Sequence, residues 1–278
     1  MDEDASLFFP LIGKEEAKNQ VEYLLHQSPR QYGLARTRWR LQDVGRALRW
    51  LEGCSEPGIY KALKRLGFSR KRAMNFIHSP DLNYHTKWKA VLRAFADAAN
   101  HPEEVVIVFL DEFSYYRQPT LACAYHQTGQ TQPYAYQLAR SNTRTRLVSV
   151  LNGLTGQVTY LQRSKIGCSA LQDYYHLVRA AYPEAKRVYV VQDNWPVHKL
   201  PEVLQSMQEN CLTPLFLPTY ASWLNPIEKL WRWLKQDILH LHTLATNLDE
   251  LRQQVRDFLD NFSTGSDRLL RYVGLLLD

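Results

Sequence analysis

The sequence has little of what marks disulfide-linked, zinc-binding or membrane-spanning proteins. Its four cysteines are scattered through 278 residues and form no CxxC pair. That usage fits reduced thiols in a cytosolic protein better than a disulfide framework or a zinc site. No run of about 18 or more apolar residues is present, and no N-terminal apolar segment resembles a secretory signal. Internal repeats and low-complexity tracts are also lacking. With 278 residues, 45% of them hydrophobic, the chain is long enough for one large domain plus a small one.

Positive charge is concentrated towards the front of the chain. Between Ser28 and His78 there are 12 Lys or Arg and 3 Asp or Glu, a local charge of +9 in a chain of net charge +6. The rest of the chain therefore carries −3. A basic front on a mildly acidic body is expected of a protein that binds nucleic acid. A solvated cationic face is the alternative, but the size of the excess favours DNA or RNA binding.

A helix-turn-helix is predicted within this basic part. Ser55 can cap one short helix, Gly67 can end it, and Ser69 can cap the next. Two short helices around a tight glycine turn are typical of this motif, whose second helix reads a DNA major groove. Three basic residues would stand at the start of that second helix: Arg70, Lys71 and Arg72. An ordinary helical hairpin with a basic surface is the alternative.

From residue 105 onward the pattern predicts a sheet. The continuous apolar runs "VVIVFL" (105–110) and "RVYVV" (187–191) are typical of strands covered on both faces. Further strands are expected near 121–126, 145–151, 157–162 and at "LTPLFL", and helices at 169–182, 201–209, 226–240 and 247–261. Three strands joined by hairpins, then alternating helices and strands, make a mixed α/β sheet.

Three carboxylates are placed where folding can bring them together. Asp111 follows "VVIVFL" and Asp193 follows "VYVVQ", at the strand ends where ligands of open α/β sheets bind. Unpaired carboxylates beside such runs are costly to desolvate, and a divalent cation such as Mg²⁺ removes that cost. Glu228, at the start of a predicted helix, is the third candidate. Acids from two strands and a helix can hold two metal ions about 4 Å apart, which activate a water or a 3′-hydroxyl.

Each acid taken alone has a simpler interpretation as a helix cap or turn former. Glu228 in particular fits a variant capping box, with Asn225 as the N-cap residue and Pro226 at the first helical position. Glu112, directly after Asp111, should point away from it because side chains alternate along a strand, so it is not included in the predicted site.

Three segments resemble the catalytic blocks of DDE transposases of the mariner superfamily, and those of the bacterial insertion-sequence-630 family most closely. They are "FLDEFSYYRQP", "VVQDNWPVH" and "LPTYASWLNPIEKLWRWLK". The second resembles an Asp-Asn pair with a His a few residues on, as in Asp193, Asn194 and His198. The third resembles a Leu-Pro-x-Tyr-Ser-Pro-x-Leu-Asn-Pro-Ile-Glu string. Between Asp193 and Glu228 lie 34 residues, the spacing typical of that group.

This resemblance implies a DNA transposase with an RNase H-like catalytic core, preceded by a small all-α helix-turn-helix domain. The expected division is a helical DNA-binding region at 1–80, a linker helix at 81–104 and the DDE catalytic domain at 105–278. Two Mg²⁺ or Mn²⁺ ions would be held by Asp111, Asp193 and Glu228, with Asn194 and His198 in supporting roles.

The same resemblance implies cut-and-paste movement of a DNA element, recognition of terminal inverted repeats, and insertion into target DNA at TA dinucleotides. A homodimer would bring two element ends together. We expect such a protein in the bacterial cytoplasm, associated with the nucleoid.

The chain departs from the family pattern without losing a ligand. Ala221-Ser222 stands where Ser-Pro is usual, Trp195 where a small residue is common, and Tyr125 where a tryptophan is expected. These transposases usually carry two consecutive helix-turn-helix units, and one fits here. We therefore expect the downstream product of a split or frameshifted element, or a truncated copy.

Two further sets of residues have open interpretations. Arg144 and Arg146 share a face of their predicted strand and are candidates for lining a DNA channel. A solvated edge strand, whose charges deter pairing, explains them about as well. Trp231 lies three residues beyond Glu228, with Leu234 three further on, a stripe that predicts core packing.

Two rivals to a transposase remain at this stage. A nuclease of the same fold, such as a resolvase or RNase H, would use the same acids, although a preceding helix-turn-helix favours duplex DNA recognition. A catalytically inactive or truncated copy that acts only as a DNA-binding protein is the other, and the intact set of three acids argues against it.

Overall fold

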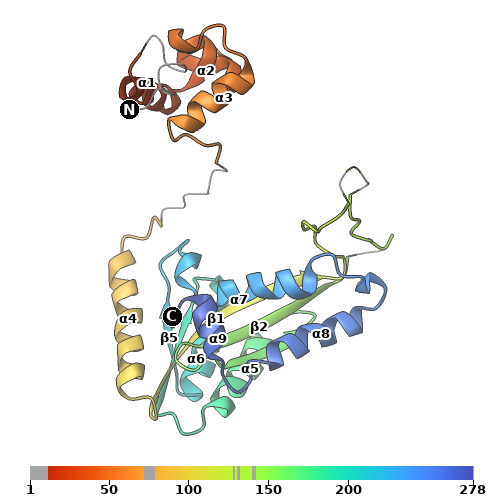
Figure 1. Ribbon diagram of the computed structural model, residues 1–278. Coiled ribbons are helices and arrows are strands. Elements are labelled where there is room, and N and C mark those ends of the chain that lie inside the picture. The colour runs from red at the N-terminus through yellow and green to blue at the C-terminus, as the bar shows by residue number, and fades with distance from the viewer. Residues whose placement is uncertain (1–11, 72–78, 128, 130–131, 140–141, 278) are drawn as a thin grey trace. The chain divides into compact units, whose positions relative to one another are not determined.

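A computed structural model describes residues 12–71, 79–127, 129, 132–139 and 142–277 of the chain (Figure 1). The chain divides into two compact units, Met1–Asn75 and Phe76–Asp278. Within the described residues, no helix is both long enough and apolar enough to cross a membrane.

The first unit is a small helical bundle. Its elements are α1 (Lys14–His26), η1 (Pro29–Tyr32), α2 (Leu41–Ala47), η2 (Arg49–Leu51) and α3 (Glu56–Arg65). The helices are amphipathic, and the apolar side chains that they bury against one another include Val21, Leu24, Val44, Ile59 and Leu63. This small core is the reason why these short helices form, because isolated helices of such length are marginal in water.

The predicted helix-turn-helix is found only in part. Ser55 caps α3, since its hydroxyl accepts a hydrogen bond from the Gly58 amide at 3.4 Å. Gly67 has a left-handed φ of +88° just beyond the helix, as predicted. The described residues Ser69 to Lys71 are not helical, however, and the rest of the predicted second helix lies outside the described residues. In the described residues α3 is instead preceded by another short helix, α2, so this pair lies one helix earlier in the chain than the predicted pair.

The second unit contains the predicted mixed α/β sheet. Its strands are β1 (Val105–Tyr116), β2 (Arg144–Asn152), β3 (Val158–Arg163), β4 (Arg187–Gln192) and β5 (Leu212–Phe216). The strand order is β3-β2-β1-β4-β5, in which β1, β2 and β3 are antiparallel and β4 and β5 run parallel to β1. The parallel connections require crossovers, which α5 (Cys168–Ala181) and α6 (Pro201–Glu209) supply.

One expected strand is wrong. Residues 121–126 form no strand, and Leu121 and Tyr125 are exposed. The segment contains no β-branched residue, and its apolar side chains have no partner to cover them. The first strand was predicted to end at residue 110. It continues to Tyr116, because its antiparallel pairing with β2 extends that far.

Helices cover both faces of the sheet, and side-chain alternation on β1 separates the two layers. Val108 and Leu110 pack with α5 and α6, whereas Ile107, Phe109 and Phe113 pack on the opposite face. That opposite face is covered by α4 (Tyr84–Asn100), α7 (Ile227–Leu234), α8 (Leu248–Asp260) and α9 (Asp267–Val273). Figure 1 shows α7 and α8 lying along β1 and β2. Helix α9 was not predicted, and α7 continues as a π-helix over Lys235–Leu239.

Two glycines allow the backbone of the β2–β3 hairpin to approach the backbone of the turn before α9. Gly156 has a φ of +71°, and a Cβ added there would lie 2.4 Å from the Ser266 carbonyl oxygen. Gly265 has a φ of +100°, and its Cβ would lie 2.7 Å from the Thr155 carbonyl oxygen. The Ser266 amide donates to that Thr155 oxygen at 2.8 Å. The two backbones therefore meet where no side chain fits.

We expect Gly156→Ala to lower the free energy of unfolding by about 2–4 kcal/mol, because it adds left-handed strain and a collision with backbone. Gly274→Ala is the matched control. Gly274 has a similar φ of +84°, but its Cβ would meet only the flexible Nζ of Lys229, at 3.0 Å. The control should lose only about 1–2 kcal/mol. Urea unfolding curves with equal midpoints for the two variants would contradict this account of the join.

Candidate active site

The three predicted acids line one pocket. Asp111, Asp193 and Glu228 reach it from β1, from the residue after β4, and from the first turn of α7. Parallel pairing of β1 with β4 ends at Phe109 and Val191, so Asp111 and Asp193 stand just beyond the carboxyl end of the parallel ladder. Asp111 is therefore within a strand that continues, and the predicted position at a strand end holds only for the parallel part of the sheet.

The start of α7 differs from the predicted capping box. The helix begins at Ile227, Pro226 already has helical φ and ψ, and no side chain caps the end. Asn225 is buried, and its amide nitrogen donates to the Leu110 carbonyl at 2.9 Å. A bond to a strand has replaced the local cap, because the Asn225 side chain faces β1 and not its own helix. It ties the helix start to the residue before Asp111, so Glu228 enters the pocket.

Trp231 is a core residue, as predicted, and also contacts an acid of the pocket. Its ring is 2% exposed and stacks on Phe113 at 5.1 Å between centroids. Its indole nitrogen donates to Asp111 Oδ2 at 2.8 Å. One side chain thus packs β1 against α7 and orients the Asp111 carboxylate.

The pocket raises the proton affinity of two of its acids. Burial raises the pKa of Asp111 well above its ordinary value, and the charges of Glu228 and Glu112 raise it further. The pKa of Glu228 is raised because the surrounding protein removes part of its hydration, although the side chain keeps contact with solvent. Asp193 also raises the pKa of Glu228, against the lowering effect of Lys235. The fold therefore holds like charges close together.

Sequence reasoning missed Glu112. Alternation does send it to the opposite face of β1 from Asp111, but there it meets the predicted His198, whose Nε2 lies 3.3 Å from Glu112 Oε1. The same Nε2 lies 3.6 Å from Asp193 Oδ1. His198 is fully buried in η3 (Pro196–Lys199), and among the described residues neither ring nitrogen has a hydrogen-bond partner. Glu112, Asp193 and His198 each offer an atom within 4.8 Å of the others, a grouping able to hold a metal ion.

Asn194 shapes the loop that carries Asp193. Its amide nitrogen donates to the Leu217 carbonyl at 2.6 Å, and its oxygen accepts from Lys199 at 2.8 Å. The Trp195 amide donates to Asp193 Oδ1 at 2.8 Å. The loop after β4 is thus fastened to the segment after β5, with Asp193 at its edge. Where the sequence has an unusual tryptophan, the Trp195 ring meets the His198 ring edge-on at 5.3 Å.

The predicted DNA-binding residues are not among those that line this pocket. Arg144 and Arg146 lie on β2, between β3 and β1, so the alternative of a solvated edge strand is wrong. Arg70 and Lys71 are exposed in the first unit, and Arg72 lies outside the described residues.

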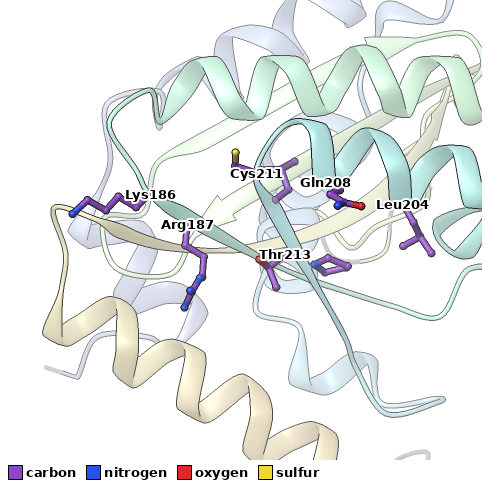
Figure 2. A pocket seen from close by; sticks show the side chains of 8 residues that line it. Lys186, Arg187, Leu204, Gln208, Cys211 and Thr213 are labelled. Carbon is purple, nitrogen blue, oxygen red and sulfur yellow. The ribbon is translucent and has the colours of Figure 1, made fainter.

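A second depression lies at the other end of the parallel strands (Figure 2). Lys186 and Arg187 stand at the start of β4, and Leu212 and Thr213 at the start of β5. None of the residues lining it is a carboxylate. The acid pocket, at the carboxyl ends of the same strands, is therefore the better candidate for chemistry.

Comparisons with known proteins agree with this geometry. The family described as DDE superfamily endonuclease matches residues 106–252, more than half of the chain. The "Insertion element IS630 uncharacterized 39 kDa protein" of Shigella sonnei is 23% identical over 244 residues, which cover 86% of this chain and 69% of that relative.

Two solved structures of the Mos1 transposase are similar in fold. Its paired-end complex with the left transposon end has a TM-score of 0.65 at 14% sequence identity, covering 95% of this chain and 75% of that one. Its strand transfer complex has a TM-score of 0.60 at 15% identity, with coverages of 95% and 74%. The fold of the sheet is accordingly RNase H-like. The chain belongs to the DDE endonuclease superfamily, as a DDE-type transposase of the group that contains IS630 and the mariner elements.

Proposed function

We propose that this chain moves a DNA element by cut-and-paste transposition, with Asp111, Asp193 and Glu228 as ligands of two Mg²⁺ or Mn²⁺ ions. The observation that carries the proposal is the convergence of three carboxylates from separate elements in one pocket. Metal ions in such a site activate a water or a 3′-hydroxyl and stabilise the leaving oxygen of a phosphodiester. Hydrolysis at the element ends would then be followed by strand transfer into target DNA.

The donor set supports a divalent cation. Asp111 and Glu228 both have raised pKa values, chiefly because burial removes hydration from their carboxylates, a cost that a bound cation would offset. On the other side of β1, the buried Glu112 Oε1 and both ring nitrogens of His198 lack hydrogen-bond partners within the described part of the chain. Carboxylate oxygens of this kind suit Mg²⁺ or Mn²⁺, whereas an imidazole nitrogen is a better ligand for softer ions such as Zn²⁺.

The surrounding residues act by orienting the acids. Trp231 holds one Asp111 oxygen, and Asn225 fixes the start of the helix that carries Glu228. We propose that Asn194 and His198 support Asp193, through the loop after β4 and through the contact at 3.6 Å respectively.

We propose double-stranded DNA as the partner, both as terminal inverted repeats and as target, with insertion at TA. The Mos1 complexes hold a transposon end in a paired-end arrangement, which supports a homodimer for this chain too. In our proposal residues 1–80 bind the element ends, 81–104 link, and 105–278 carry out the chemistry. DNA contacts would come from five basic residues: Arg70, Lys71, Arg72, Arg144 and Arg146.

The cation site makes a prediction for the metal-free protein. The raised pKa of Asp111 means that the folded state holds its proton more tightly than the unfolded chain. The contribution of Asp111 to stability is therefore fully present below the unfolded pKa of 3.8 and is lost as pH rises through the folded value. Asp111→Asn removes the repelled charge but keeps an oxygen for Trp231. In EDTA at pH 7 it should raise the melting temperature by at least the roughly 2–4 °C that 1 kcal/mol produces.

The difference between wild type and Asp111→Asn should shrink as pH falls, and added Mg²⁺ should stabilise only the wild type. Asp173→Asn, an exposed change on α5, is the matched control and should be nearly neutral. A lower melting temperature for Asp111→Asn in EDTA at pH 7 would show that its charge is not repelled in the pocket.

Cleavage and strand transfer test the function itself. With Mg²⁺ or Mn²⁺ and DNA carrying the flanking inverted repeats, the wild type should nick the ends and join them to target. Asp193→Asn should reduce both rates by more than about 100-fold, since metal ligation supplies several kcal/mol to such transition states. Its DNA binding should persist.

The other outcomes separate the rivals. Binding without cleavage in both wild type and Asp193→Asn would favour an inactive copy that serves as a DNA-binding protein. Cleavage that needs Asp193 but never joins ends to target would favour a nuclease of the same fold.

A further inference from the structure

One face of the antiparallel end of the sheet is open to solvent. Beyond Glu112 the strands alternate: Phe113 and Tyr115 are buried on the face of α7 and α8, whereas Ser114 and Tyr116 are exposed on the other. Antiparallel sheets tolerate such one-sided exposure. The exposed side lies on the face that α5 and α6 cover further along the same strands.

Arginines stand in register on this open face. Arg146 of β2 pairs directly with Arg163 of β3 and, on its other side, with Ser114 of β1. Arg144 is two residues away on β2 and points the same way. We call these three residues, Arg144, Arg146 and Arg163, the arginine face.

The arginine face is not explained by folding. Like charges directly opposite each other on neighbouring strands are destabilising. In the described part of the chain none of the three guanidinium groups forms an ion pair, and the buried Arg146 Nε has no hydrogen-bond partner. Charges that prevent edge pairing explain neither Arg144 nor Arg146, because β2 is an interior strand; Arg163 lies on the edge strand β3. The nearest acid along this face of β1 is Glu112, which lies against His198.

The arginine face is also close to the acid pocket. Glu112 pairs with Val148, and Ser114 pairs with Arg146. Arg146 is therefore two residues, about 7 Å along the strand, from the position opposite Glu112. His198 connects Glu112 to Asp193, which lines the pocket. A phosphate backbone lying on the arginine face would therefore lie within two residues of Glu112, on the sheet face opposite Asp111.

Resting on the proposed function, we propose that the arginine face binds the phosphate backbone of target DNA during strand transfer. Contacts from arginines to phosphates fix position but carry no sequence information. That suits target DNA, which has no fixed sequence beyond a TA step, whereas terminal repeats require base recognition, which we assign to the basic helical region. Charge complementarity supplies the attraction, and guanidinium groups are well suited to phosphate oxygens.

Salt dependence of DNA binding tests this proposal without requiring catalysis. The probe is a duplex of about 25 base pairs with a central TA and no inverted repeat, bound by the full-length chain in EDTA. Each lost phosphate contact reduces the slope of log affinity against log salt by about 0.9. Arg146→Gln with Arg163→Gln should therefore make the slope shallower by about 1.8.

A matched control removes the same charge elsewhere. Lys89 and Arg93 are exposed on α4, which packs on the other face of the sheet. The double variant Lys89→Gln with Arg93→Gln should keep the wild-type slope. An unchanged slope in the arginine-face variant, or an equal reduction in the control, overturns the proposal.

An assay that starts from uncleaved ends with limiting target, and that follows end cleavage and strand transfer separately, identifies which DNA is bound. The arginine-face variant should show a ratio of strand transfer to end cleavage about tenfold below wild type, and saturating target should restore it. If end cleavage falls as much as strand transfer, the face binds element ends and the target assignment is wrong. If the wild type neither cleaves nor joins while the shift in salt slope persists, the proposed function fails and DNA binding by this face stands.

Discussion

Desolvation of carboxylates that stand close together is the constraint on which the rest of the site depends. The fold brings Asp111, Asp193 and Glu228 to one pocket, where burial and mutual repulsion raise the proton affinity of two of them. Such an arrangement costs stability unless something compensates it, and proteins keep costs of this kind at functional sites. The contacts made by Trp231 and Asn225 hold the acids in place against that repulsion.

Strand β1 organises this site because it presents acids to both faces of the sheet. Asp111 points towards α7 and meets Trp231, while the next residue, Glu112, points the other way and meets His198. Asp193, at the end of the neighbouring parallel strand, lines the pocket and also contacts His198. The reactive end of the sheet is thus supported from two layers.

Much of this arrangement could be predicted from the sequence, because it depends on local patterns. Continuous apolar runs located β1 and β4, and the acids that follow them located two corners of the pocket. Glu228, the third acid of the pocket, was identified by its spacing from Asp193 and by the resemblance of its segment to a catalytic block of the transposase family. The Asn225 contact could not be predicted, since a local capping box and a bond to a distant strand use the same residues. Glu112 was left out of the predicted site because side-chain alternation correctly points it away from Asp111. The sequence does not reveal that His198 meets Glu112 on that opposite face.

The most direct test of the shared cation site is anomalous diffraction from crystals of this protein soaked in Mn²⁺. The account predicts anomalous density between the carboxylates of Asp111, Asp193 and Glu228, within coordinating distance of their oxygens. Density that touches Glu112 and His198 but neither Asp111 nor Glu228, or no density in the pocket at saturating Mn²⁺, would contradict it.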